Sequence, residues 1–483
     1  MVVNSINFLI FFVVVFTVYY LPICGKTPRF QNLWLLLTSY FFYGFADWKM
    51  VPLLLGATLV FFCIGLWLKS EMEKGHVKNA SNITTLGVIL GVSVLLYFKY
   101  LNFFAESFAQ LLGAIGLTVS WTTLNIVLPI GVSFFTFKLI SYVIEIHREH
   151  IEPCINFIDF GTYIAFFPTL LSGPIDRPNS FLPQLGGARS FKYDLAVDGC
   201  RQILWGMFTK MCIADNLAKA TDSVWATYSE QSGATLLIAA LLYFIQMYAD
   251  FDGYSNMAIG VGKVLGFSIT RNFNHPLLAR NIAEYWQKWH ISLTSWITDY
   301  IFMPLNIAFR DKGNMGVVLA CIINLIVIGL WHGANWTFLL FGLYHGLLFL
   351  PLILSGSFGK NKRLKSNSKG LPRLYDFIMM ALTFCFVSLG LIIFRAPSIM
   401  AALKFFSGII SNSLFCIPSI ALSKEIFVLI LIFLSSEWIF REKEFSLQGL
   451  KMSIISRWTL YFLLVFLILY LKGEQTPFIY TQF

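Results

Sequence analysis

Three histidines stand in apolar sequence, where an imidazole could transfer protons. His332 and His345 lie in the stretch "GLWHGANWTFLLFGLYHG", and His290 lies in "WQKWHISLTSW". Imidazole has a pKa near neutrality, so it can take a proton from a hydroxyl and return it to a leaving group. With His290 or Asn335 nearby to orient it, His332 suits acyl transfer from an activated donor to an alcohol.

The surrounding sequence predicts a membrane hairpin that positions His332. Two apolar runs, 317–331 and 336–354, flank the polar turn 332–335. The first run has 15 residues, or about 22 Å of helix, whereas a full crossing takes roughly 20 residues. We therefore expect the turn to stop inside the membrane or at its outer boundary. An ionisable residue at such a backbone break is a functional candidate, which favours a catalytic role for His332.

His345 has a different context. In one uninterrupted helix it would lie about 140° around the axis from His332, so the two rings would not converge. In a hairpin it lies well down the returning arm. A hydrogen-bonded packing histidine is the favoured interpretation of His345.

The segment around His290 predicts one helix over residues 280–303, capped by Asn281 and ended by Pro304. At 100° per residue, His290 falls at the centre of its apolar face. It would then point into the fold or the lipid, where a core histidine and a functional one are both open interpretations.

Four further residues are candidates for substrate binding: Asn335, Trp331, Trp286 and Asp252. A tryptophan such as Trp286, like its neighbours Trp289 and Trp296, is more often a packing residue or an anchor at the membrane interface than a catalytic group. Asn335 can also hydrogen-bond a turn locally, so structural roles remain open for Trp286 and Asn335.

The composition indicates an all-α, polytopic membrane protein. The 483 residues are 57% hydrophobic and 12% charged, with a mean hydropathy of +0.71. Recurring apolar runs predict about eleven to thirteen membrane segments, some of them re-entrant or interfacial. The net charge of +10 fits basic cytoplasmic loops, such as the six-cation stretch 360–373, rather than nucleic-acid binding.

The domain organisation expected is one integral membrane domain over 1–483. Polar and glycine-containing interruptions concentrate in 129–350, which we expect to be the catalytic core around an intramembrane chamber. Residues 374–483 predict additional C-terminal transmembrane helices with fewer polar interruptions.

Several chemistries are disfavoured by missing motifs. The sequence has no dinucleotide or P-loop glycine pattern, no HExxH, no EF-hand loop and no GxSxG elbow. The eight cysteines show no metal-binding spacing, so no metal site is expected. Transport of a small solute or ion stays an alternative, because Asp250 and Asp252 could line a pathway, although no matching halves are visible.

Four motifs in order carry a family resemblance: "LPIGVSFFTFKLISYVIEIHRE", "YADFDGYSNMAIGVGKVLGFSITRNFNHP", "WQKWHISLTSWITDYIFMPL" and "GLWHGANWTFLLFGLYHG". They resemble the membrane-bound O-acyltransferase (MBOAT) superfamily. Through "QILWGMFTKMCIADNLA" and the spans beyond 374, the chain is most similar to the bacterial alginate O-acetylation (AlgI-like) branch. "SGPIDR" also resembles the shorter D-alanine transferases of teichoic acids (DltB-like).

This resemblance implies a ring of helices around a central chamber, with His332 as the catalytic histidine and His290 as the second signature position. It implies no bound cofactor and an acyl donor such as acetyl-CoA or another acyl thioester. It further implies a bacterial cytoplasmic (inner) membrane location. The implied partners are an extracytoplasmic acetyltransferase, a polysaccharide acceptor reached directly or through that protein, and membrane lipids. D-alanyl transfer to teichoic acid is the alternative within the family.

Overall fold

The computed structural model describes residues 3–21, 27–117, 127–360, 370–474 and 476. The chain forms two compact units, one of residues 1–200 and 258–270 and the other of residues 201–257 and 271–483. Most of the cationic stretch 360–373 lies outside the described residues. The expectation of one integral domain with a core over 129–350 stays a prediction.

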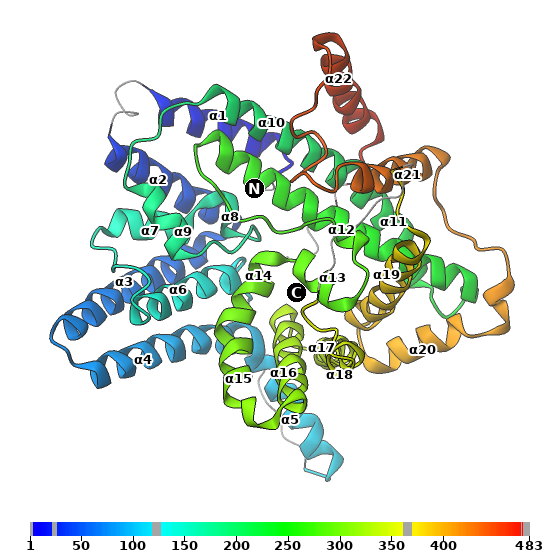
Figure 1. The fold of residues 1–483 in the computed structure, drawn as a ribbon, viewed down its shortest axis with the longest axis horizontal. Coiled ribbons are helices and arrows are strands. Elements are labelled where there is room, and N and C mark those ends of the chain that lie inside the picture. Colours follow the sequence, from blue (N-terminus) through cyan, green and yellow to red (C-terminus); the bar gives the residue numbers. More distant parts are fainter. Residues whose placement is uncertain (1–2, 22–26, 118–126, 361–369, 475, 477–483) are drawn as a thin grey trace. The chain divides into compact units, whose positions relative to one another are not determined.

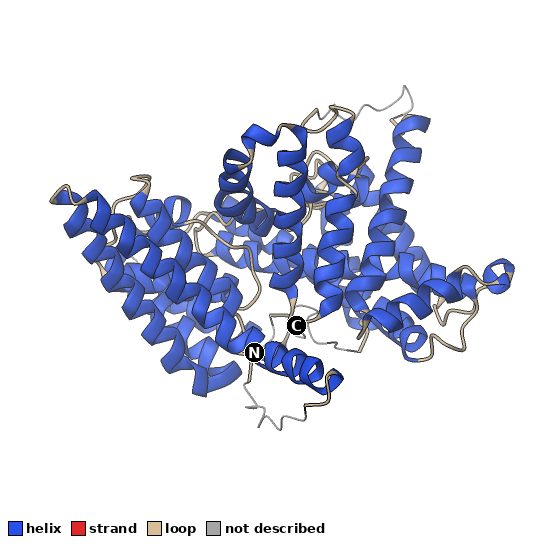
Figure 2. Cartoon of the chain, turned by 90° about the horizontal axis from the view of Figure 1, so that it is seen from below, coloured by secondary structure: helices blue, strands red, loops and turns tan. Residues whose placement is uncertain are grey.

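Every regular element in the described part of the chain is a helix (Figure 2), which confirms the all-α prediction. Within the described residues, seven helical stretches are long and apolar enough to cross a membrane. This number is lower than the segment count expected from the sequence. One stretch, Pro28–Glu73, contains two helices, and the apolar helices Ile6–Tyr20 and Ile399–Ile409 are too short to count.

The first unit is built mainly from sequential helices. They are α1 (Ile6–Tyr20), α2 (Pro28–Asp47), α3 (Val51–Glu73), α4 (Val77–Leu95), α5 (Leu101–Ala114), α6 (Val132–His147), α7 (Phe157–Ala165), α8 (Phe167–Leu170) and α9 (Pro178–Phe181). In α1 the buried residues recur every three or four positions, so one face packs inward. Its other face carries exposed isoleucine, leucine and valine, as expected of a helix that faces lipid.

The second unit contains all three histidines singled out from the sequence. Its helices include α11 (Asp215–Ala226), α13 (Ile282–Lys288), α14 (Ile291–Ile297), α15 (Met303–Ala308), α16 (Asn314–His332), α17 (Trp336–Leu347), α18 (Leu350–Leu354), α19 (Leu374–Arg395), α20 (Ile399–Ile409), α21 (Lys424–Ile439) and α22 (Ile454–Leu471). Two further helices, α10 (Tyr193–Phe208) and α12 (Gly233–Val264), contribute residues to both units.

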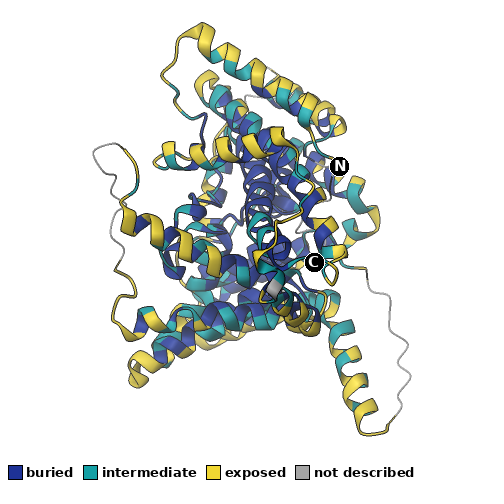
Figure 3. Ribbon diagram, turned by 90° about the vertical axis from the view of Figure 1, so that its right-hand side faces the viewer, coloured by how far each residue is buried: buried dark blue, intermediate teal, exposed yellow. Residues whose placement is uncertain are grey.

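Burial differs strongly between these helices. The most apolar window of α12 is 78% buried, whereas that of α22 is only 11% buried. Figure 3 shows both kinds of helix, with buried residues in dark blue and exposed ones in yellow. The part of α12 within the second unit contacts one of its candidate residues, because the ring centroid of Phe251 lies 4.7 Å from that of His290.

The hairpin predicted around His332 is confirmed. Helices α16 and α17 lie side by side (Figure 1) and are joined by the short turn 333–335. Glycines allow the close approach: a Cβ built at Gly329 would lie 2.1 Å from the carbonyl oxygen of Phe338, and one at Gly342 would lie 2.4 Å from that of Leu325. The two backbones are in direct contact there.

The rising arm of the hairpin is longer than predicted. Helix α16 has 19 residues because it begins at Asn314, directly after Gly313 in a positive-φ conformation. Its length is about 28 Å at 1.5 Å per residue, close to a full crossing. The predicted arm length of 15 residues is therefore wrong, whereas the expectation that the turn stops inside the membrane or at its outer boundary stays a prediction.

The single helix predicted over 280–303 is also wrong. The chain breaks between α13 and α14 at Trp289 and His290, and Pro304 lies in the first turn of α15 instead of ending a helix. The predicted cap at Asn281 is confirmed, because its side chain accepts a hydrogen bond of 2.8 Å from the Glu284 backbone N–H.

Candidate functional site

Three buried histidines form the centre of the candidate site in the second unit. His290 and His345 are fully buried and His332 is 4% exposed. His290 lies at the break before α14, His332 is the last residue of α16, and His345 lies in α17. The three imidazole rings therefore come from a helix break, from the end of a helix and from the interior of a helix.

Aromatic rings connect these histidines. The Trp331 ring centroid lies 5.6 Å from that of His290 and 5.0 Å from that of His332. Phe341 lies 6.3 Å from His332 and 4.5 Å from His345. We call these five residues, together with Trp286, the aromatic histidine cluster.

Trp286 joins the cluster at His345. Its ring centroid lies 5.3 Å from the His345 ring in an edge-to-face arrangement. Of the four residues predicted to bind substrate, Trp331 and Trp286 thus contact candidate histidines. Their roles toward a substrate stay predictions.

Asn335 and Asp252 make contacts of another kind. The Asn335 side chain caps α17 by accepting from the Thr337 N–H at 3.1 Å, and it donates to the Pro397 carbonyl at 3.1 Å. Asp252 on α12 accepts a hydrogen bond of 2.8 Å from Asn256. These three contacts are made within the fold, and a substrate role for either residue stays a prediction.

The surroundings of His345 do not match the hydrogen-bonded packing histidine favoured by the sequence. Neither of its ring nitrogens has a hydrogen-bond partner among the described residues. The Nε2 side faces Gly390 of α19, where a built Cβ would lie 2.7 Å away. Ring contacts with neighbours such as Phe341 and Trp286 hold the side chain in place.

His290 adopts a left-handed backbone conformation, with φ of 45°. This conformation is uncommon for a residue with a Cβ, and such strain often occurs at functional sites. Its Nδ1 lies 3.0 Å from the Oδ1 of Asn272. Burial lowers the pKa of His290 to about 3, so the ring is neutral at physiological pH.

Asn272 is a buried neighbour of His290 that the sequence reasoning did not single out. Its Oδ1 also accepts a hydrogen bond of 2.9 Å from the Ser292 hydroxyl, and its amide group donates to Ser255 at 3.1 Å. Asn272 is the first of two asparagines in "TRNFNHP", which is part of one of the motifs quoted above. No local periodicity connects it to a histidine 18 positions later.

A fourth histidine of this unit has charged neighbours. The Nδ1 of His275 lies 3.1 Å from the Glu437 carboxylate, and its Nε2 lies 3.1 Å from the carbonyl oxygen of Lys443. Burial lowers the pKa of His275, but the Glu437 carboxylate outweighs this effect and the pKa lies above its ordinary value. With an acceptor at each nitrogen, His275 is suited to the protonated form.

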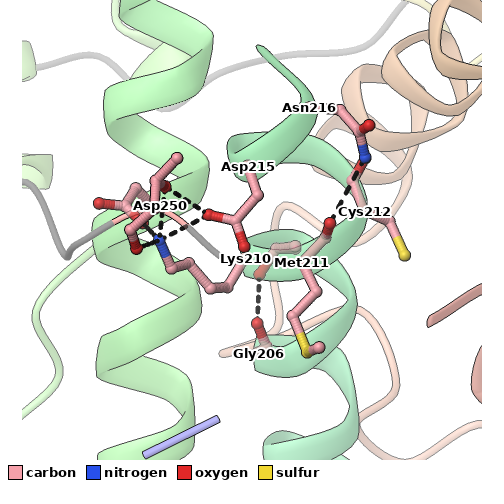
Figure 4. A network of polar contacts seen from close by, with 9 residues as sticks. Gly206, Lys210, Met211, Cys212, Asp215, Asn216 and Asp250 are labelled. Atoms are coloured by element: carbon pink, nitrogen blue, oxygen red, sulfur yellow. Dashed lines mark hydrogen bonds and ion pairs between the residues drawn. The ribbon is translucent and has the colours of Figure 1, made fainter. Parts of the chain in front are cut away.

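Asp250, which the transport alternative placed along an ion pathway, belongs to a buried ion cluster. Lys210 forms ion pairs with Asp215 and Asp250 (Figure 4), and the Asp215 pair has an N–O distance of 2.8 Å. The Thr476 hydroxyl donates to Asp215 at 2.7 Å. We call Lys210, Asp215, Asp250 and Thr476 the ion cluster; its charges are held by fixed partners.

An apolar cavity of about 610 Å³ lies in the same unit, between α19 and α21. Its walls include Phe377, Phe384 and Leu434, with Glu437 at one side. None of the three histidines of the aromatic histidine cluster lines this cavity. The central chamber expected around those histidines stays a prediction.

The chain has clear relatives among known proteins. Residues 40–358 match the MBOAT, membrane-bound O-acyltransferase family. The chain is 35% identical over 416 residues to the probable alginate O-acetylase AlgI of Pseudomonas aeruginosa, and the match covers 85% of this chain and 75% of that protein.

Two further relatives differ in the acyl group or acceptor that their names give. Identity is 30% over 416 residues with the peptidoglycan O-acetyltransferase of Helicobacter pylori, covering 80% of this chain and 75% of that protein. The identity is 29% over 284 residues with the teichoic acid D-alanyltransferase of Bacillus subtilis, and this match covers 56% of this chain and 69% of that protein. With its membrane-spanning helices and its match to the family model, the chain belongs to the membrane-bound O-acyltransferase family and is a multi-pass membrane enzyme of acyl transfer to a hydroxyl.

Proposed function

We propose that this enzyme transfers an acetyl group from a cytoplasmic acyl thioester, such as acetyl-CoA, toward O-acetylation of an extracytoplasmic polysaccharide. The observation that carries the proposal is the aromatic histidine cluster, in which Trp331 contacts both His290 and His332. The names of the alginate and peptidoglycan relatives support acetyl as the acyl group and a polysaccharide as the final acceptor. The proposed location is the bacterial cytoplasmic membrane.

In the proposed reaction His332 is the general base. It takes the proton from the acceptor hydroxyl while the hydroxyl oxygen attacks the thioester carbonyl carbon. The carbon–sulfur bond then breaks, and the proton passes from His332 to the leaving sulfur. The products are an acetyl ester and a free thiol, and no further reactant is required.

His290 has the second role in this proposal, which is to position the reacting groups. The left-handed backbone at the α13–α14 break fixes its ring next to Trp331. Holding donor and acceptor in a reactive geometry is itself a large part of catalysis. Because the acceptor lies on the far side of the membrane, we further propose that the acetyl group reaches the polymer directly or through an extracytoplasmic partner acetyltransferase.

D-alanyl transfer to teichoic acid is the second candidate within the family. It is favoured only by the similarity to the D-alanyltransferases, which covers 56% of this chain for the Bacillus protein. The acetylase relatives cover 80% or more of this chain, including residues toward its C-terminal part. Acetyl transfer is therefore the function that we put to the test.

The test supplies purified enzyme in vesicles with acetyl-CoA labelled in the acetyl group. Alginate oligosaccharides, peptidoglycan fragments and a D-alanyl carrier with teichoic acid serve as separate arms. We expect label on a polysaccharide hydroxyl with the wild-type enzyme and none with His332→Ala. Label transfer at the normal rate by His332→Ala would overturn the assignment of the base, and solute uptake without covalent transfer would overturn the proposed function.

A further inference from the structure

The segment that precedes α13 holds the helix break at His290 in place. The backbone carbonyl of Asn272 accepts from the Ile291 N–H at 2.8 Å, and the Asn274 N–H donates to the carbonyl of Lys288 at 3.0 Å. These two hydrogen bonds flank the break on either side. The main chain of Asn272 is therefore held in place independently of its side-chain contacts.

The Asn272 side chain is fully buried and contacts three groups. Its Oδ1 faces the Nδ1 of His290 at 3.0 Å and the hydroxyl of Ser292 at 2.9 Å. Its amide nitrogen donates to the hydroxyl of Ser255 at 3.1 Å. The contacts come from the break, from α14 and from α12, so the side chain cannot rotate without losing several of them.

This arrangement determines which nitrogen of His290 carries the hydrogen. Because Oδ1 is an acceptor only, the Nδ1 that faces it must be the donor. A neutral imidazole has one donor and one acceptor nitrogen, so the lone pair lies on Nε2. The ring also makes edge-to-face contacts with Phe251 at a centroid distance of 4.7 Å and with Trp331 at 5.6 Å, which fix its orientation further.

We propose that Asn272 is a positioning residue that holds His290 as the Nδ1–H tautomer, so that Nε2 accepts a hydrogen bond from a hydroxyl of the acceptor substrate. The inference rests on the proposed function and narrows it. His290 acts on the acceptor, since an Nε2 without hydrogen cannot polarise the thioester carbonyl. A polysaccharide acceptor carries neighbouring hydroxyls, so one can bind Nε2 of His290 while another gives its proton to His332.

The tautomer is measured first, because this readout does not depend on activity. Solid-state NMR of enzyme with ¹⁵N-labelled histidine, compared with His290→Gln for assignment, reports which ring nitrogen carries hydrogen. We expect a protonated Nδ1 and an unprotonated Nε2. The reverse pattern would overturn the inference even if acetyl transfer were active, whereas failure of all acetyl transfer would overturn only the proposed function.

The kinetic test uses Asn272→Leu, which keeps a similar shape and cannot accept a hydrogen bond. With the acceptor that takes label in the assay above, we expect the KM for acceptor to rise by about tenfold, the equivalent of one hydrogen bond. The KM for acetyl-CoA should stay unchanged. Ser292→Ala should shift the acceptor KM in the same direction by a smaller factor, and Asn79→Leu provides the same chemical change at an exposed position.

Asn272→Asp separates positioning from a merely structural role. The carboxylate still accepts from Nδ1–H, so the acceptor KM should be near normal at high pH. Its charge favours the protonated ring, which has no lone pair on Nε2, so the acceptor KM should rise as the pH falls. The wild-type KM should stay flat over the same range. A flat profile for Asn272→Asp, or a rise of the donor KM instead in Asn272→Leu, would overturn the inference.

Discussion

Around Lys210 the buried charges are paired with one another, whereas around His332 the buried rings contact aromatic side chains. In the ion cluster, Lys210 has a carboxylate on either side and Thr476 donates to Asp215. In the aromatic histidine cluster, Trp331 and Phe341 separate the imidazoles. The first arrangement fixes charge in the fold, and the second holds the imidazole rings by contacts with aromatic rings.

The largest effect that distinguishes the two regions is on catalysis. Replacing His332 by alanine should lower acetyl transfer by at least about 100-fold, since general-base catalysis contributes on that scale. The melting temperature of His332→Ala should fall by no more than is usual when a buried side chain is shortened. His76→Ala, which alters a half-exposed histidine paired with Glu71, is the control and should keep full activity.

The ion cluster should show the opposite pattern, a loss of stability. Lys210→Met leaves two buried carboxylates without their cation, and breaking a buried pair in this way costs about 3–5 kcal/mol. Denaturation in detergent should show the loss. Lys219→Met breaks an exposed pair with Glu474 and should change the unfolding free energy little. Equal stability of the two variants would contradict a structural role for the cluster.

A smaller effect concerns pH and tests His275, which has a carboxylate neighbour, against the histidines of the aromatic histidine cluster. The pKa of His275 is raised in the folded state by Glu437. Its contribution to stability is therefore complete below the unfolded pKa of about 6.5 and is lost as the pH rises through the folded pKa. Melting temperatures should fall over that window in the wild type and fall less in His275→Gln. A steeper fall in the variant would show that the sign is wrong.

The smallest effect is expected at His345. Leucine there would keep an apolar side chain of similar volume, and neither ring nitrogen has a hydrogen-bond partner among the described residues. We expect a stability change under about 1.5 kcal/mol and a milder loss of acetyl transfer than in His332→Ala. If the two variants lost activity equally with intact folds, His345 would have to join His332 in the reaction.

The sequence was informative where a local signal decided the structure. The hairpin followed from two apolar runs and a polar turn, and the cap at Asn281 followed from its spacing to Glu284. The break at His290 could not be predicted in this way, because no glycine or proline marks it. Main-chain bonds from Asn272 and Asn274 bracket it, and helical periodicity does not register such tertiary contacts.

The same limit applies to the site. Residue type and membrane context identified His332 and His290 as candidates, and both are buried in one cluster. Asn272 was missed because its importance lies in which atom of His290 it faces, and sequence spacing does not specify atoms. The length of α16 was missed because the helix begins at Asn314, three residues before the apolar run, and continues through His332 after it.

The direct backbone contact at Gly329 and Gly342 has a mechanical consequence. With main chain against main chain at both positions, neither arm of the hairpin has space to slide or rotate alone. The imidazole at its tip can then be displaced only when both helices travel together as a rigid body. A bulkier residue at Gly329 or Gly342 would therefore wedge the two arms apart and move the catalytic candidate at the tip, although neither glycine touches it.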